Sequence, residues 1–150
     1  MLELPIDLEM LQEALDNASY EMAYYLDKET GEILFSTEDF PLEALPGKTA
    51  SKSEIQAFEQ RYLAIPVAQS QEGYSDMEAF ITTVEAPELR DKLAVAIDGK
   101  GAFRRFKNVL LEEPTERKRW FEFKTECSRR RTLRWLKGEG IIVPGEPDID

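Results

Sequence analysis

The sequence has no histidine and only one cysteine among its 150 residues. Without histidine there are no Ser-His or Cys-His nucleophile systems, no common zinc sites and no ordinary proton shuttle at neutral pH. The single thiol, Cys127, has no second cysteine with which it could form an internal disulfide. Catalysis by this chain would therefore depend on carboxylates, lysine, tyrosine or arginine, and this excludes most classes of enzyme.

Long apolar runs are also missing, so we expect no membrane-spanning segment and no membrane partner. The first ten residues, MLELPIDLEM, lack the cationic and apolar stretches of a secretory signal. No sequence motif indicates a cofactor or a metal site. A cytoplasmic location is the default expectation, since nothing points to a secreted disulfide-bonded protein.

The composition is that of a folded protein, with 42% hydrophobic residues beside a net charge of −11. A chain of this length matches one domain and can bury most of its apolar surface. We therefore predict a single α+β domain over residues 1–143. Residues 144–150 are predicted to form an acidic C-terminal tail.

The N-terminal half contains the pattern of a small sheet. Aromatic and aliphatic residues from Met22 to Phe35 flank a short polar segment in which Gly31 can take the left-handed conformation of a turn. A third apolar run extends from Tyr62 to Ile65. These segments predict a three-stranded antiparallel meander.

Helical spacing dominates the rest of the chain. Asp7 is placed to cap a helix up to Asn17, and a short helix is expected over residues 52–59. In the C-terminal half, Ser70 as an N-cap, Pro87 in a first turn and Pro114 predict helix starts. The meander is expected to pack against this mostly helical half. The predicted core residues of that half are Phe80, Leu93, Phe103, Phe106, Trp120 and Phe123.

Charge is divided unevenly along the chain. Residues 1–99 hold 6 Lys and Arg against 21 Asp and Glu, whereas residues 100–137 hold 13 against 5. Two interpretations remain open. Cations of the last helix can pair with acids of the N-terminal half, because Lys124, Arg131 and Arg134 fall in the same helical arc as its apolar residues, and an unpaired buried charge is costly. That arc contains Trp120, Phe121, Phe123, Cys127 and Trp135.

The second interpretation is a binding surface. The segment from Gly99 to Lys107 places glycines before a helix start and cations opposite the phenylalanines, an arrangement that favours anions. It is not a phosphate-binding P-loop, because no predicted strand leads into the glycines. The partner would be a protein or a phosphate-bearing ligand. The candidate residues are Lys100, Arg104, Arg105 and Lys107, with Arg129, Arg130 and Arg131 as possible additions.

The alternative to a binding or regulatory module is an enzyme that uses carboxylates. Paired acids can bind Mg²⁺ or transfer protons, and Glu72 and Asp76 lie four residues apart on one predicted helix with Glu78 and Glu85. Acids at a helix start more often interact with the helix dipole. We therefore favour a non-enzymatic module and name no catalytic residue. Cys127 is interpreted as an inert thiol in the core.

Several strings in the sequence resemble one known family, and together they span most of residues 7–142. The resemblance is to an uncharacterised bacterial protein family, UPF0158. It implies a cytosolic bacterial protein with a single domain, and it transfers no activity, cofactor or partner to any residue. The strings are EMAYYLDKETGE (residues 21–32), EGYSDMEAF (72–80), ELR (88–90), GKGAFRRFK (99–107) and WFEFK (120–124).

Overall fold

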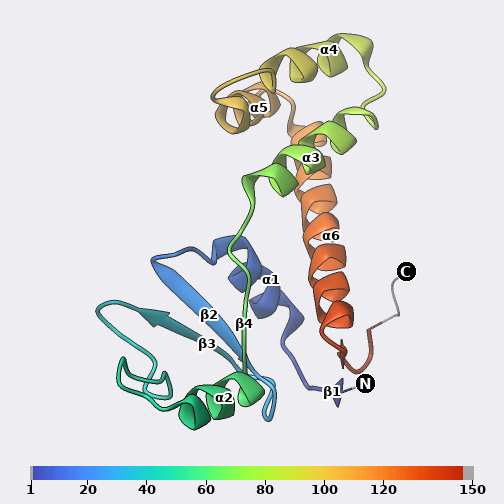
Figure 1. Ribbon diagram of the computed structural model, residues 1–150. Coiled ribbons are helices and arrows are strands. Elements are labelled where there is room, and N and C mark those ends of the chain that lie inside the picture. Colours follow the sequence, from blue (N-terminus) through green and yellow to red (C-terminus); the bar gives the residue numbers. More distant parts are fainter. Residues whose placement is uncertain (1, 147–150) are drawn as a thin grey trace. The chain divides into compact units, whose positions relative to one another are not determined.

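The computed structural model describes residues 2–146, which form two compact units (Figure 1). The α/β unit contains the chain up to Ala68 and again from Ser128, and the helical unit runs from Gln69 to Cys127. The long helix α6 (Pro114–Gly138) contributes its first part to the helical unit and its last part to the α/β unit. The protein is an α+β protein, as predicted. Its treatment as one domain stays a prediction, because each unit has a core of its own.

The α/β unit is built around the predicted antiparallel sheet, whose central strand is β2 (Met22–Asp27). Strands β3 (Ile33–Thr37) and β4 (Tyr62–Ala64) pair with β2 on opposite sides. The strand order β3-β2-β4 therefore differs from that of a simple meander. The connection through α2 (Lys52–Arg61) is long enough to carry the chain past the hairpin, so that β4 pairs with the remaining edge of β2.

A buried carboxylate fixes the corner between the hairpin and α2. Asp27 is 2% exposed and accepts hydrogen bonds from Arg61 Nε at 3.1 Å, Arg61 Nη2 at 2.9 Å and the Glu29 backbone N–H at 2.9 Å. The bonds from Arg61 lower the pKa of Asp27 from its ordinary 3.8 to about 2. Gly31 closes the turn at a φ of 83°, where a Cβ would lie 3.0 Å from the carbonyl oxygen of Pro5.

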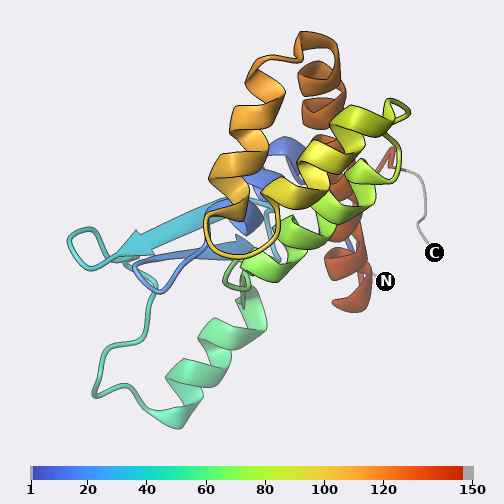
Figure 2. The same cartoon turned by 90° about the horizontal axis from the view of Figure 1, so that it is seen from above.

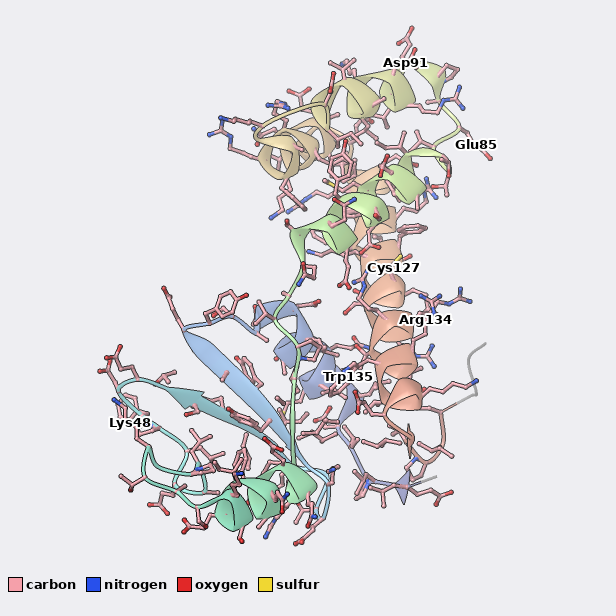
Figure 3. All side chains as sticks on the ribbon, in the orientation of Figure 1. Lys48, Glu85, Asp91, Cys127, Arg134 and Trp135 are labelled. Atoms are coloured by element: carbon pink, nitrogen blue, oxygen red, sulfur yellow. The ribbon has the colours of Figure 1, made fainter. Side chains whose placement is uncertain are left out.

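Helix α1 (Leu8–Asn17) covers the sheet, and Asp7 caps it as predicted by accepting from the Met10 backbone N–H at 3.2 Å. The two ends of the described chain pair as short parallel strands, β1 (Leu2–Glu3) and β5 (Ile141–Ile142). Figure 3 shows Trp135 on the side of α6 that faces α1 and Arg134 on the opposite side. The buried core of the unit comprises Leu4, Ile6, Leu11, Ala14, Ala18, Leu26, Ile65, Leu133, Leu136, Ile141 and Val143.

The helical unit consists of α3 (Ser70–Ile81), α4 (Pro87–Ala96), α5 (Ala102–Leu111) and the first part of α6 (Figure 2). Phe80 is fully buried at its centre, with ring centroids of Trp120, Phe123 and Phe106 at 5.3, 5.5 and 6.2 Å. Phe80, Leu93, Phe106 and Trp120 are buried as predicted, and Phe123 packs against them while partly buried. Aromatic contacts thus dominate this core.

Three local predictions were wrong. Phe103 is 43% exposed, because Ala102, Phe106 and Leu110 take the buried face of α5 and leave Phe103 at its edge. Phe121 is exposed, since one residue beyond the buried Trp120 turns a helical side chain by about 100° away from the core. Ser70 is the first residue of α3, and Gln69 before it makes no side-chain cap.

The C-terminal tail is described only up to Glu146, whose Oε2 lies 2.7 Å from Arg129 Nη2. The remaining residues of the predicted tail lie outside the described part of the chain. None of the helices in residues 2–146 combines the length and hydropathy needed to cross a bilayer.

Candidate functional site

The predicted cationic segment forms the outer face of α5. Ala102, Phe106 and Leu110 anchor the helix in the core, which turns Arg104 and Lys107 outward. Lys100 is exposed in the loop before the helix. Within residues 2–146, the side chains of Lys100, Arg104 and Lys107 have no carboxylate partner. These three cations, which we call the α5 cationic face, are therefore not neutralised within the described structure.

Arg105 has a different role from its neighbours. Its Nε donates to the Ala96 carbonyl at 2.8 Å, its Nη2 donates to the Asp98 carbonyl at 2.6 Å, and its Nη1 donates to the Lys100 carbonyl. These carbonyls lie at and just beyond the C-terminal end of α4, where backbone acceptors lack helical partners and carry partial negative charge. Arg105 thus fixes the corner between α4 and α5, and we leave it out of the α5 cationic face.

Two glycines and a tyrosine complete this corner. Gly99 and Gly101 have φ values of 85° and 78°, in the left-handed region that favours glycine. The Tyr74 hydroxyl donates to the Ile97 carbonyl at 3.0 Å. The predicted position of the glycines before a helix start is confirmed, since Gly101 is the N-cap residue of α5. The start of α5 is held by side chains from α3 and α5.

The other three predicted binding residues belong to the α/β unit. Arg129 is half-buried and forms an ion pair with Glu146. Arg130 is exposed and Arg131 half-buried, and both make interactions within the protein. The partner of Arg129 is an acid of the C-terminal tail, so this pair does not test the pairing interpretation, which concerned acids of residues 1–99. The α5 cations, unpaired within residues 2–146, are the observation that favours the binding interpretation. A binding role for Arg129, Arg130 and Arg131 stays a prediction.

Three of the four acids of the enzyme alternative line different hollows of the described structure. Asp76 lines a small cavity beside α5, Glu78 lines a groove between α3 and α4, and Glu85 lines a larger cleft. Glu85 also lies in the loop after α3 and not on the helix itself, as Figure 3 shows. Among residues 2–146, no three His, Cys, Asp or Glu side chains are grouped to hold a metal ion. Paired carboxylate chemistry by Glu72 and Asp76 stays a prediction.

The larger cleft, with a volume of about 660 Å³, was not anticipated from the sequence. Arg119 lines this cleft, and its Cζ lies 4.9 Å from the centroid of the Phe80 ring. Its Nη2 donates to Glu116 Oε2 at 2.8 Å and to Thr83 Oγ1 at 3.1 Å. The hydrogen bonds to Glu116 raise the pKa of Arg119 above its ordinary value. The spacing of Glu116 and Arg119 was a usable sign of this pair, since residues three apart are neighbours on a helix. The contact with Thr83 had no sign in the sequence.

Comparisons with known proteins identify the family to which the chain is similar. The family model described as "Uncharacterised protein family (UPF0158)" matches residues 1–150. A UPF0158 protein of Pseudomonas aeruginosa is 28% identical over 141 residues, which cover 94% of this chain and 87% of that protein. UPF0158 proteins of Chlamydia muridarum and Chlamydia trachomatis are each 27% identical over 93% of this chain. No solved structure matches the chain significantly.

The protein is thus an α+β protein that combines a small antiparallel sheet with a helical unit whose core is rich in aromatic side chains. The chain belongs to the UPF0158 family, which confirms the resemblance seen in its sequence. It spans 87% of the Pseudomonas relative but only 42% of each of the two Chlamydia proteins. The relatives are bacterial, and their names state no activity.

Proposed function

We propose that this protein is a non-enzymatic binding or regulatory module whose interaction surface is the α5 cationic face. The observation that carries the proposal is that Lys100, Arg104 and Lys107 are exposed and have no carboxylate partner among residues 2–146. Their partner is therefore anionic, a phosphate-bearing ligand or an acidic protein surface.

Rigidity supports a binding role for this face. Arg105 and Tyr74 hold the corner before α5, and Phe106 and Leu110 are buried beneath the helix. The cations thus stand on a backbone that need not be ordered when a partner arrives. A preorganised surface loses less conformational entropy on binding than a mobile one.

The net charge of −11 does not prevent binding of an anion at this face. At physiological ionic strength, charges more than about 8 Å apart are largely screened from one another. Local cations therefore dominate the potential close to α5, whereas the acids elsewhere slow the approach of a polyanion. Binding should consequently be weak at high salt and strengthen as salt is lowered.

The test is retention on a heparin column together with a titration of labelled nucleotides and nucleic acids at low salt. Reversing two charges, with Arg104→Glu and Lys107→Glu, should abolish retention and binding. The fold should survive, because exposed cations contribute little to stability.

The matched control reverses two exposed cations of the same unit outside α5, Arg90→Glu with Lys118→Glu. It changes the net charge of the protein by the same amount, so it should retain most of the binding. Equal losses in the two double variants would show that overall charge, and not the α5 face, governs binding. No binding of any anionic probe by the wild type would overturn the proposal.

A further inference from the structure

An exposed aromatic ring lies beside the α5 cationic face. Phe103 is 43% exposed although it belongs to a helix with a well-buried apolar side. Phe103 and Lys107 are four residues apart and therefore neighbours on the helix surface, and Arg104 follows Phe103 directly. An exposed apolar ring thus lies beside Lys107 of the α5 cationic face and is followed in the sequence by Arg104.

The ring is held in place by the helix next to it. Gly73 of α3 has no side chain, and a Cβ built there would lie 3.1 Å from Cε1 of Phe103. The Phe103 ring therefore packs closely against α3 at Gly73, and a side chain at this position would require the ring to shift by a few tenths of an ångström. Contact on one side and exposure on the other are what a stacking platform requires.

The surroundings of the ring include further cations. Phe103 lines a cavity of about 80 Å³ together with Gly73, Lys107 and Lys124 of α6. Lys124 is exposed, so its ammonium group adds a fourth positive charge on this side of the unit. Asp76 also lines the cavity as its one acid, and it is 9% exposed and makes an interaction within the protein.

We infer that the anionic partner of the α5 cationic face is a single-stranded nucleic acid, with phosphates on Lys100, Arg104 and Lys107 and a base stacked on Phe103. The inference rests on the proposed function and narrows it. Proteins that bind single strands combine a positive surface with exposed aromatic rings, because every unpaired base offers a flat face for stacking. The bases of a duplex are already stacked on one another, so a duplex would use the cations but not Phe103.

The experiment measures binding of a labelled single-stranded oligothymidine and of a duplex of the same length, by fluorescence anisotropy at several salt concentrations. Three phosphate contacts predict a log–log salt slope of about −2 for the single strand. Phe103→Leu keeps an apolar side chain against Gly73 but removes the flat ring. It should weaken single-strand binding about tenfold and leave duplex binding unchanged.

Two further variants sharpen the test. Phe103→Tyr keeps the ring and should bind the single strand like the wild type. Phe121→Leu is the matched control, since Phe121 is a phenylalanine of the helical unit with a similar exposure of 49%, and its ring also lies beside a cation, Arg117. It should leave both affinities unchanged. Circular dichroism of each variant, compared with the wild type, verifies that the helices are intact.

The outcomes separate the two proposals. Equal affinity for single strand and duplex, or an unchanged single-strand affinity in Phe103→Leu, would overturn the inference and leave an anion-binding α5 face in place. Binding of an acidic protein but of no nucleic acid would do the same. Failure to bind the oligonucleotides, heparin and every other anionic probe would overturn both.

Discussion

The two units each use an arginine to fix a corner, and they do so with different chemistry. In the α/β unit, Arg61 at the end of α2 pairs with the buried carboxylate of Asp27. In the helical unit, Arg105 donates to three neutral backbone carbonyls instead. The first arrangement depends on the ionisation of an acid, whereas the second does not. Acid and salt should therefore act on the two units unequally.

The largest expected effect is the loss of an aromatic side chain from the helical core. Phe106→Ala should lower the free energy of unfolding by about 3–5 kcal/mol, because it removes a ring that is 1% exposed and packed against Phe80 and Trp120. Urea unfolding measures the change, and a loss below about 1 kcal/mol would contradict the burial of this ring.

The Phe106→Ala variant can also be used to test whether the two units unfold in one cooperative transition. The chain has two tryptophans, and Trp120 lies in the helical unit while Trp135 lies in the α/β unit. Replacing one or the other with phenylalanine leaves fluorescence that reports on one unit. If residues 1–143 form one cooperative domain, Phe106→Ala should shift both reporters equally. A shift of the Trp120 reporter alone would show two domains.

A smaller effect is expected from Asp27→Asn, which removes the buried carboxylate partner of Arg61 and leaves its exposed partner, Glu29, in place. We expect a loss of about 1–2 kcal/mol, reduced because Arg61 is itself partly exposed to solvent and so screened. Arg105→Lys provides the comparison in the other unit. Lysine cannot present three donors in one plane, so this variant should also lose stability, but without any added dependence on pH.

The smallest effect is the pH dependence of the wild type. The pKa of Asp27 is about 2 in the folded protein and 3.8 ordinarily, so the unfolded chain binds a proton more readily. The stabilisation by Asp27 is therefore complete above about pH 5 and is lost progressively as the pH falls through 3.8 towards 2. Urea midpoints measured across this range should fall in the wild type. They should fall less in Asp27→Asn, and an equal fall would contradict the role of this carboxylate.

The elements of the fold were largely predictable from the sequence, because periodic apolar residues and turn chemistry act locally. Asp7, Gly31 and Pro87 lie where their chemistry indicated. The strand order was not predictable in this way, since either edge of the hairpin offers hydrogen bonds to β4. The sequence likewise suggested two interpretations of the charge without deciding between them.

The candidate site was only partly predictable. Arg104 and Arg105 are adjacent and chemically identical, yet Arg104 is exposed and Arg105 reaches three carbonyls around the end of α4. The turns at Gly99 and Gly101 determine which arginine faces α4, and no residue pattern encodes that geometry directly. The burial of Phe103 was mispredicted for a similar reason. Its ring packs against Gly73 of α3 at the edge of the core, and this position depends on how α3 and α5 pack, which the residue pattern does not encode.

The parallel pairing of β1 with β5 brings the beginning of the described chain close to its end. Leu2 is the partner of Ile141 in this pair, so the first described residues lie beside a strand that is close to the end of the described chain. A fold whose two ends lie close together can be inserted into a loop of another polypeptide, and its own ends can be joined by a short linker. Circular permutation, with new ends opened in the exposed segment between β3 and α2, should therefore preserve the sheet and both cores.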